Sequence, residues 1–457
     1  METINLGEKT KPDRDVDLVK AEFEELKRTM FKRLHHYPPL SFGCEYSGDP
    51  DIRTLWGKED GEGTLYLHIP FCVTRCKYCP FFTSAGSQKQ DVDDYLELLI
   101  KEIDMYKEVA GHLKFTSLYF GGGTPTYMNE EQFGRIYEYV AKHFSIEGAD
   151  ITVEANPLTI TDRKLRFLKS LGVTRISVGI QTFNENVLKI VDRYIPMETM
   201  SRTLELVKGV GFEDFNVDLM YGLPEQTLEI WQEDIEKFIA NGIKSLTIYR
   251  TGYFPHALKE FTMKGYRLPD DDDVDRMYRY AFKRLNEAGF RQPHIGSTFF
   301  MRSGINRNRE NILLSKPTLA LGVSAYSASA HYQYQNIVNM DAYRQKVLNN
   351  EPAIGEIVGI SNGDRLRKYV IEATKLGYMD KEVFKTIFGI SISDVFGMEL
   401  LALKEMGLIS ENGKDISFTF EGVRYIKEIR YLFVDKEKKK QLVITGRPIN
   451  NRKGELP

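Results

Sequence analysis

The chain has 457 residues, of which 42% are apolar and 12% aromatic, which is enough for two or three domains with sizeable cores. Its 62 basic and 65 acidic side chains give a net charge of −3, so no nucleic-acid partner is expected. No stretch approaches the roughly 18 continuous apolar residues of a membrane span. Four cysteines and no hydrophobic signal segment predict a cytoplasmic protein without a disulfide scaffold.

The first 60 residues predict an N-terminal helical extension. Residues 15–36 have the pattern of a charged amphipathic helix, and the connector HHYPPLSFG after them is broken by prolines. We interpret residues 1–60 as a lid or brace. The adjacent His35 and His36 in the connector would then close over a substrate.

Residues 61–290 alternate short β-rich runs with longer amphipathic helical stretches. The runs span residues 65–68, 117–121, 150–154, 175–181, 216–222 and 245–250. Six strand-helix units in this order predict an α/β fold, a parallel sheet that curls into a partial (β/α)6 barrel. Polar residues stand at the carboxyl ends of these strands, where parallel barrels assemble their active sites.

The remaining chain predicts two further units. Residues 291–358 contain the strand-like LALGVSAYS and are expected to complete the barrel or cover a substrate. Residues 359–457 change to shorter helices and a hairpin-like SENGKDISFTFEG, which predicts a small helical, winged-helix-like domain. Its mixed charge favours docking or substrate covering over reading nucleic acid.

Three cysteines in the loop HIPFCVTRCKYCPFF are the most informative local pattern: Cys72, Cys76 and Cys79. Three thiolates can hold a [4Fe–4S] cluster with one iron left open, whereas electron-transfer clusters are normally closed by four. An open metal position is typical of catalysis. A disulfide and a structural zinc site are the alternatives, and the loop has no obvious fourth zinc ligand. Cys44, 28 residues upstream, is interpreted as a buried free thiol.

Further polar residues follow successive predicted strands. Glycines in YFGGGTPT let the backbone approach a ligand and offer its amides. A carboxylate in TVEANP ends an apolar strand, where burial requires a partner. Their joint placement predicts a ligand site at the strand ends, formed by Gly122, Gly123, Thr124, Glu154, Gln181, Arg193 and Asp218.

The segments LYLHIPFCVTRCKYC, YFGGGTPT, VEANP, VGIQTF and VDLMYGLP together resemble the coproporphyrinogen-dehydrogenase-like branch of the radical S-adenosylmethionine superfamily. The resemblance covers roughly residues 64–335. It implies a [4Fe–4S] cluster on the three cysteines and S-adenosyl-L-methionine (SAM) as cofactor, cleaved to a 5′-deoxyadenosyl radical. It further implies that Tyr66 contacts the cofactor beside the cluster, that Gly122, Gly123 and Thr124 line its methionine end, and that Glu154, Gln181, Arg193 and Asp218 hold it.

Two members of this branch fit the sequence poorly. The oxygen-independent coproporphyrinogen dehydrogenase carries a further cysteine two residues after the third, where this chain has Phe81. The haem chaperone carries a His-Asn pair followed by Tyr-Trp. The comparable positions here are Asn308 and Arg309, followed by Ile312 and Leu313.

The run Pro80, Phe81 and Phe82 is similar to the cluster loop of the anaerobic haem-degrading, anaerobilin synthase group. That resemblance implies a methyltransferase that opens haem to a methylated linear tetrapyrrole with release of iron, fed by a low-potential donor such as flavodoxin. Haem chaperoning and coproporphyrinogen III dehydrogenation remain the alternatives. Candidate haem contacts are His256, His294 and His331, although a structural histidine is the commoner case.

Overall fold

The computed structural model describes residues 15–29, 31, 34, 36–43, 51–290, 294–296, 298–302 and 306–444. Cys44 and His35 lie outside these residues. The six predicted strands are present and run parallel to their neighbours. They are β1 (Glu62–Ile69), β4 (Lys114–Gly122), β5 (Asp150–Ala155), β6 (Arg175–Gln181), β7 (Asp214–Tyr221) and β8 (Ser245–Arg250).

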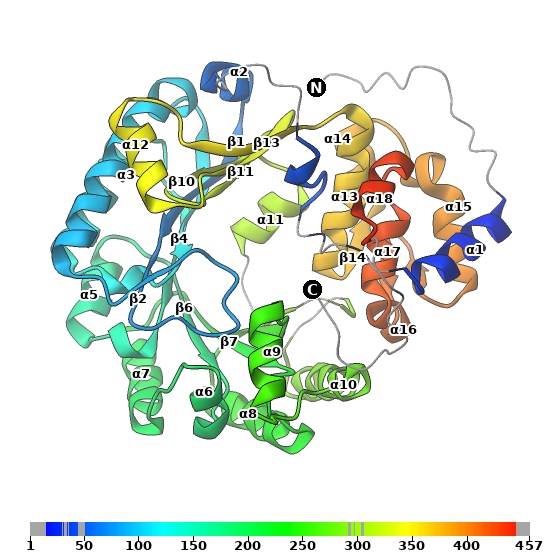
Figure 1. Cartoon of the computed structure of the whole chain (residues 1–457), viewed down its shortest axis with the longest axis horizontal. Coiled ribbons are helices and arrows are strands. Elements are labelled where there is room, and N and C mark those ends of the chain that lie inside the picture. The colour runs from blue at the N-terminus through cyan, green and yellow to red at the C-terminus, as the bar shows by residue number, and fades with distance from the viewer. Residues whose placement is uncertain are drawn as a thin grey trace.

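Further strands extend this sheet at both edges. On one side lies β9 (Phe299–Met301), antiparallel to β8. On the other side β10 (Thr318–Leu321) runs parallel to β1 and is followed by the antiparallel β11 (Tyr326–Ala328), β12 (Tyr332–Asn336) and β13 (Ile354–Gly359). Within the described residues this gives one eleven-stranded mixed sheet in the order β13-β12-β11-β10-β1-β4-β5-β6-β7-β8-β9. The sheet curves into the predicted partial barrel (Figure 1).

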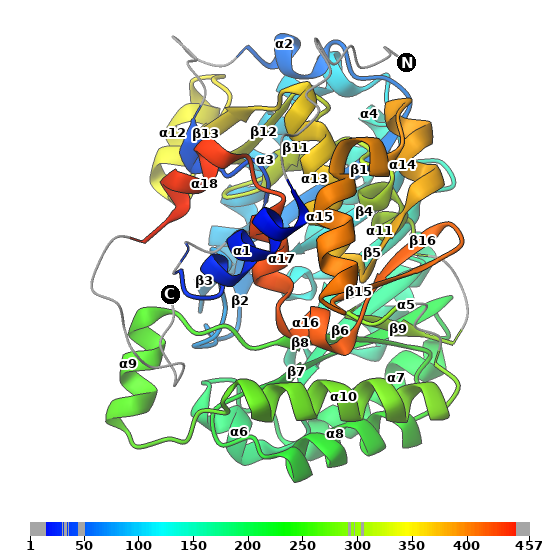
Figure 2. The same cartoon turned by 90° about the vertical axis from the view of Figure 1, so that its right-hand side faces the viewer.

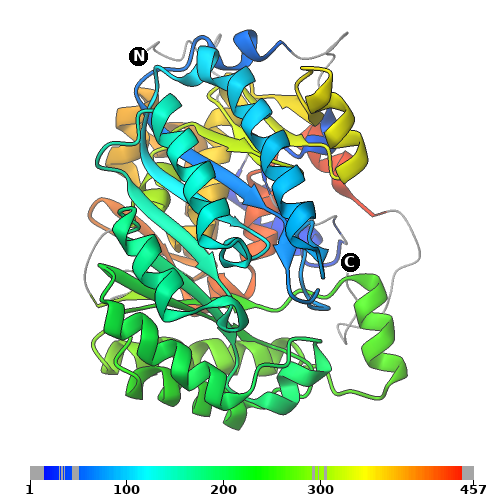
Figure 3. The same cartoon turned by 90° about the vertical axis from the view of Figure 1, so that its left-hand side faces the viewer.

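Helices cover the outer face of the curved sheet (Figures 1 and 3). Every residue of β6 is buried, as expected where a parallel sheet is covered on both sides. The covering helices follow their strands in the chain: α3 (Lys89–Ala110), α4 (Glu130–His143), α5 (Asp162–Ser170), α6 (Glu185–Ile190), α7 (Met197–Val210), α8 (Leu228–Ala240) and α10 (Asp271–Glu287). Helix α9 (Pro255–Met263) instead packs by the cysteine loop, where Glu260 pairs with Lys77 at 2.8 Å. Short helices α2 (Ile52–Trp56) and α12 (Met340–Leu348) flank the β10 side.

The short helix α11 (Arg307–Leu313) lies within the curve of the sheet (Figure 1). Asn311 anchors it near the amino ends of the strands, because its amide donates to the Gly63 carbonyl at 3.2 Å and to the Thr64 hydroxyl at 2.9 Å. The Arg307 backbone N–H donates to Asp150 at the start of β5. Helix α11 therefore closes the end of the barrel opposite the cysteine loop.

The C-terminal region forms a second core (Figure 2). It contains α13 (Asn362–Leu376), β14 (Tyr378–Asp380), α14 (Lys381–Phe388), α15 (Ile392–Glu405), β15 (Ile409–Asn412), β16 (Asp415–Phe418), α16 (Phe420–Arg424), α17 (Ile426–Leu432) and α18 (Lys436–Leu442). The strands pair in the order β14-β16-β15, and β15 and β16 are the expected hairpin. Three of these helices and the three strands follow one another in the order α13-β14-α14-α15-β15-β16. This order matches the winged-helix-like architecture.

The N-terminal helix is shorter than the predicted 15–36. Helix α1 spans Val16–Leu26 and packs against α15 and α17. Beyond it, Phe31, Leu34 and Tyr37 are buried in the same C-terminal core, and Phe31 makes an antiparallel bridge with Val443. Apolar residues that the periodicity assigns to a helical face are thus buried beyond the end of the helix, because tertiary packing outweighs helix propensity.

Among the described helices, we find none with the length and apolar composition that crossing a bilayer requires.

Candidate active site at the strand ends

The three predicted cluster ligands lie in the loop that follows β1. Cys72 ends the short strand β2 (Phe71–Cys72), and Cys76 and Cys79 lie between it and its partner β3 (Ser84–Ala85). All three are free thiols. Burial raises the pKa of the Cys72 thiol and raises the pKa of the Cys79 thiol to about 11. Because a bound metal offsets this desolvation, we expect the thiolates to form when metal binds.

The donor set fits a cluster better than one metal ion. The described part of the chain has no group of three His, Cys, Asp or Glu side chains placed to hold a single ion. A [4Fe–4S] cluster instead takes its thiolates on separate irons. Two buried polar atoms at the loop, the Tyr78 hydroxyl and Arg193 Nε, have no hydrogen-bond partner. Such atoms fit a site that binds a further, anionic group.

Arg193 links the cysteine loop to β6. Its Nη1 donates to Cys76 Sγ at 3.3 Å and its Nη2 to the Gly179 carbonyl at 2.6 Å. An added Cβ on Gly179 would lie 2.6 Å from Gln181 Nε2 and 2.8 Å from Arg193 Nη2, so glycine is required for both side chains to reach this point. Gln181 itself has φ +71°, a strained conformation of the kind found at binding sites.

Glu154 lies at the centre of the predicted cofactor residues. It accepts hydrogen bonds from the Tyr119 hydroxyl at 2.7 Å and from the Gly122 backbone N–H at 3.2 Å. Burial raises the pKa of Glu154 to about 7, although the bond from Tyr119 lowers it. Tyr119 stacks on Tyr66, with ring centroids 5.9 Å apart. A carboxylate in this position gains most from a cationic ligand, which would favour its ionised form.

The glycine run serves close packing inside the protein. Gly122 has φ +102°, and an added Cβ there would lie 2.3 Å from the His68 ring. An added Cβ on Gly123 would lie 2.7 Å from the Ile69 carbonyl oxygen. The N–H of Gly123 donates to the Ile69 carbonyl and that of Thr124 to the Phe71 carbonyl. Both amides bond to carbonyls of the protein itself, and contact between this glycine run and a ligand stays a prediction.

His68 and Thr124 connect the run to the cysteine loop. The Thr124 hydroxyl lies 3.4 Å from Cys72 Sγ. His68 Nδ1 lies 3.2 Å from the Tyr66 hydroxyl and its Nε2 3.2 Å from the Phe82 carbonyl oxygen. Burial lowers the pKa of His68 to about 4, so its ring is neutral at physiological pH. These contacts give His68 a structural role.

Asp218 lies on β7, deeper in the barrel. It accepts hydrogen bonds from the Ser177 hydroxyl at 3.0 Å and from the Asn216 amide at 2.8 Å. Burial raises the pKa of Asp218, and the charge of Asp218 contributes to the raised pKa of Glu154. The structure thus brings the predicted cofactor residues onto one continuous inner surface, from the cysteine loop across β1, β4, β5, β6 and β7.

The sequence analysis did not identify two buried polar residues, Asp234 on α8 and Gln226 just before this helix. Asp234 accepts from the Thr182 hydroxyl at 2.7 Å and from the Phe183 N–H at 2.6 Å. Gln226 donates to Asp234 at 3.2 Å and accepts from the Leu223 N–H at 3.1 Å. The pair fixes the loops that follow β6 and β7, which carry Gln181 and Asp218. Its only sequence signal is a carboxylate at a buried helical position.

Tyr249 is a partly exposed residue of the inner face. It lies on β8, on the same face as Thr247, whose register partner is Asp218. Leu246 and Ile248 are fully buried, yet Tyr249 keeps 47% of its surface exposed. The charges of Asp218 and Glu154 act on Tyr249, so this exposed side chain lies beside the candidate site.

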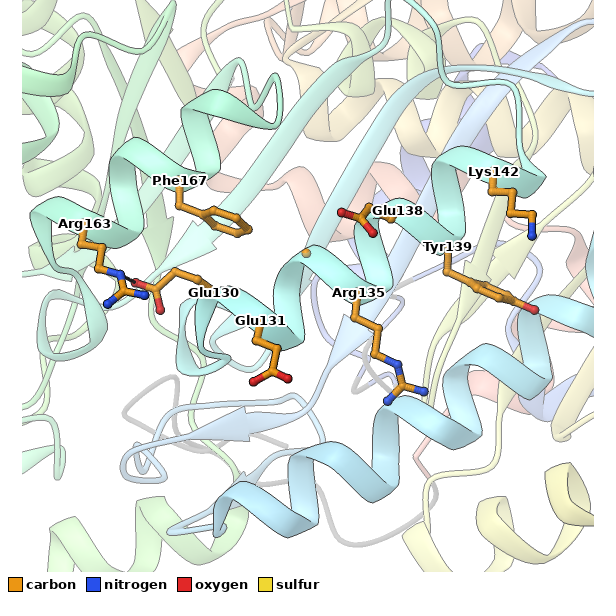
Figure 4. A pocket seen from close by; sticks show the side chains of 9 residues that line it. Glu130, Glu131, Arg135, Glu138, Tyr139, Lys142, Arg163 and Phe167 are labelled. Atoms are coloured by element: carbon orange, nitrogen blue, oxygen red, sulfur yellow. Dashed lines mark ion pairs between the residues drawn. The ribbon is translucent and has the colours of Figure 1, made fainter.

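A second hollow lies on the outside of the molecule. Figure 4 shows it over α4 and α5, with Glu130, Glu131, Arg135 and Arg163 among the residues that line it. Its charged side chains form surface ion pairs, such as Arg163 with Glu130 at 3.5 Å. This hollow is on the opposite face of the sheet from the cysteine loop and belongs to the helix layer.

The three candidate haem contacts are not brought together. His256 lies on α9 and stacks on Phe254. His294 stacks on Tyr378 of the C-terminal sheet, with its Nδ1 2.6 Å from the Ser417 hydroxyl. His331 lies in the turn between β11 and β12, where its carbonyl accepts from the Ile360 N–H. A haem contact by any of them stays a prediction.

Two positions that separate the members of the family branch are also located. Phe81 follows the cysteine loop and is 56% exposed. Asn308, Arg309 and Ile312 lie on α11, inside the curve of the sheet. Both sites therefore adjoin the barrel, one at each end.

The fold and this site have the features of a radical SAM protein. Residues 66–238 match the model of the Radical SAM superfamily, and a [4Fe–4S] cluster and SAM are the cofactors that this match implies. The solved structure of coproporphyrinogen III oxidase (HemN) from Escherichia coli, a radical SAM enzyme, superposes with a TM-score of 0.76 and 25% identity over 89% of this chain and 99% of that chain.

Curated relatives place the chain more closely. The heme chaperone HemW of Lactococcus lactis is 28% identical over 79% of this chain and 94% of its own length. The oxygen-independent coproporphyrinogen III oxidase of Salmonella typhimurium is 27% identical over 88% of this chain and 92% of its own length. The chain is therefore similar over most of its length to two kinds of protein, a heme chaperone and a coproporphyrinogen III oxidase.

Proposed function

We propose that this chain is a radical SAM enzyme that acts on a tetrapyrrole. The observation that carries the proposal is the agreement in fold and sequence with coproporphyrinogen III oxidase over most of both chains, together with the partly exposed Tyr249 on the inner face beside the cofactor residues. A planar macrocycle entering this face would meet the rings of Tyr66 and Tyr119 on the sheet, and aromatic faces stack on such ligands.

We further propose haem as the substrate, opened by radical C-methyl transfer to a methylated linear tetrapyrrole with release of iron. This finer assignment rests on Phe81 in place of a further cysteine and on Asn308 and Arg309 in place of a His-Asn pair. A low-potential donor such as flavodoxin would supply electrons. The relatives' names support the two alternatives instead, haem chaperoning and coproporphyrinogen III oxidation.

Several residues of this chain would bind and orient the cluster and SAM. When bound, the cluster and SAM supply the radical chemistry and the transferred carbon. Arg193 donates to Cys76 Sγ at 3.3 Å and so orients this ligand. Glu154 offers a carboxylate to the cationic cofactor, with Tyr119 fixing its orientation. Neutral His68 fills the space between Gly122 and the cysteine loop and excludes water from it.

Anaerobic turnover with ferrous haem tests the function. Reconstituted protein, SAM and a low-potential reductant are combined, and the tetrapyrrole and nucleoside products are identified by mass spectrometry. Haem opening predicts loss of haem, a methylated linear product, free iron, and both 5′-deoxyadenosine and S-adenosylhomocysteine. Intact haem after repeated cofactor cleavage would support the chaperone. Conversion of coproporphyrinogen III to protoporphyrinogen with release of carbon dioxide would support the oxidase.

A further inference from the structure

The guanidinium of Arg309 reaches from α11, within the curve of the sheet, to the inner face of β9 (Figure 1). Its Cζ lies 5.0 Å from the centre of the Phe299 ring. Phe299 is level with Thr247 of β8, and Thr247 is level with Asp218 of β7. Residues level with one another on neighbouring strands share a face. Phe299 therefore lies on the face that carries Asp218, two strands or about 10 Å from it.

Side-chain hydrogen bonds agree with this placement. The Thr247 hydroxyl donates to Asn216 at 3.2 Å, and the Asn216 amide donates to Asp218 at 2.8 Å. Side chains of neighbouring strands can bond in this way only on one face of the sheet. Arg309 therefore reaches the same inner surface that carries the predicted cofactor residue Asp218.

A second guanidinium contacts the same ring. Arg175 at the start of β6 has its Cζ 5.1 Å from the centre of the Phe299 ring. The charge of Arg175 is offset by an ion pair with Asp214, which also accepts from the Ser245 hydroxyl at 2.7 Å. A phenyl ring stabilises a cation through its quadrupole but carries no charge of its own. The contact with Phe299 therefore leaves the positive charge of Arg309 in place on the inner surface.

Large side chains stay accessible next to Arg309. Ile312 lies one turn further along α11, on the same face of the helix as Arg309, and is 39% exposed. The half-exposed Tyr249 lies two residues along β8 from Thr247, on the same inner face. Arg309 and Tyr249 also interact electrostatically. Helix α11 and β8 thus leave accessible apolar surface beside a guanidinium.

This combination selects a ligand that has an apolar body and a carboxylate. Binding sites for small molecules are lined mainly by apolar and aromatic side chains, with a few polar groups that fix the orientation. The planar guanidinium of arginine matches a carboxylate, with which it forms two parallel hydrogen bonds. A carboxylate at Arg309 also offsets the repulsion between the two guanidiniums that share the Phe299 ring.

We infer that Arg309 binds a carboxylate of the substrate, with Ile312 and Tyr249 beside the body of the same molecule. The inference rests on the proposed function, since tetrapyrroles such as haem carry propionate side chains. Arg309 then holds one propionate near Phe299, about 10 Å along the sheet from Asp218. This contact fixes which edge of the macrocycle lies toward the cofactor residues.

Equilibrium binding of two probes to the reconstituted full chain tests this role. The probes are ferric haem and its dimethyl ester, in which the propionates carry no charge, and binding is followed by the haem absorbance. Wild-type protein should bind haem about tenfold more tightly than the ester, as a charge-assisted hydrogen bond provides. Arg309→Gln should lose about tenfold in haem affinity and keep the ester affinity of wild type. Arg309→Lys keeps the charge without the planar fork and should lose less.

The controls separate recognition of a carboxylate from a structural role. Arg307→Gln removes a charge from the same helix, at an exposed residue whose side chain pairs with Glu310 at 2.7 Å, and should leave both affinities unchanged. Equal losses for haem and ester in Arg309→Gln would show that Arg309 serves the fold, and wild-type discrimination in this variant would show that another group reads the carboxylate. Either result would overturn the inference and leave haem as the substrate. Failure of wild type to bind either probe would overturn haem as substrate, and the role of Arg309 with it.

Discussion

Two buried glutamates, Glu102 and Glu154, show how a structural carboxylate differs from a functional one in this fold. Burial raises the pKa of each to about 7. Glu102 on α3 is fully satisfied, because it accepts from Tyr343, the Gly322 N–H and Asn336, each at 2.7 Å. These donors come from α12 and the β10 side of the sheet, so Glu102 joins the helix layer to the strands.

Glu154 has fewer donors and an open neighbourhood. It accepts from Tyr119 and Gly122, and the inner face beside it leads to the half-exposed Tyr249. The pKa therefore does not distinguish the two carboxylates. The number of donors and the access of solvent do, since only Glu154 retains capacity for a ligand.

The largest expected effect comes from the cysteine loop, which belongs to the same candidate site as Glu154. Replacing Cys72, Cys76 or Cys79 by alanine removes one of three cluster ligands, so each variant should lose the cluster and all cleavage of SAM. Iron and sulfide content, cluster absorbance and 5′-deoxyadenosine formation measure this. Cys44→Ala is the control and should keep the cluster. Full activity in any of the three loop variants would contradict the cluster assignment.

The two glutamates should respond oppositely to the same substitution. Glu154→Gln removes a carboxylate that pairs with the cationic cofactor and should weaken SAM binding by about 1.5 to 3 kcal/mol, with the cluster and fold intact. Glu102→Gln places an amide among three donors and should lower the free energy of unfolding by about 1 to 3 kcal/mol, with SAM affinity unchanged. Calorimetric SAM titration and urea unfolding of both variants distinguish the cases.

The same titration extends to the other predicted cofactor residues. Alanine at Gln181, Arg193 or Asp218 should weaken SAM binding while the cluster remains. If these variants and the Glu154 variant all bound SAM as wild type does, the strand ends would serve the fold alone.

Asp234 combines features of the structural and the functional carboxylate. Like Glu102 it accepts hydrogen bonds from several protein donors, but it supports the loops of the candidate site. Asp234→Asn should weaken its bonds to Thr182 and Phe183, and so disturb the strained backbone of Gln181. We expect a loss of about 1 kcal/mol in SAM affinity that accompanies a similar loss in stability. Lower stability with wild-type SAM affinity would show that the loop keeps its position without Asp234.

The sequence predicted the barrel well because its strands are short apolar runs between long amphipathic helices, and a run of this kind is assigned to a strand without ambiguity. It also predicted that polar residues at the ends of parallel strands converge, and Glu154 and Asp218 do lie close enough for their charges to interact. Their part in binding SAM stays a prediction. Asp234 was missed because a carboxylate on a helix is usually exposed. The burial of Phe31, Leu34 and Tyr37 was missed because it depends on a core built about 330 to 400 residues later in the chain.

The smallest expected effect is the pH dependence of stability, tested at Glu102. The pKa of Glu102 in the fold, about 7, lies above its ordinary value of 4.5, so the native state holds a proton that the unfolded state releases. The stabilisation is complete below about pH 4.5 and is lost as the pH rises to about 7. Glu102→Gln should reduce this slope by at most about 1.4 kcal/mol per pH unit, measured by urea unfolding from pH 5 to pH 7. Glu97→Gln, on the exposed side of α3 and paired with Arg135 at 2.6 Å, should keep the wild-type slope. Equal slopes in wild type and the Glu102 variant would mean that Glu102 is already ionised in the fold, held by its three donors.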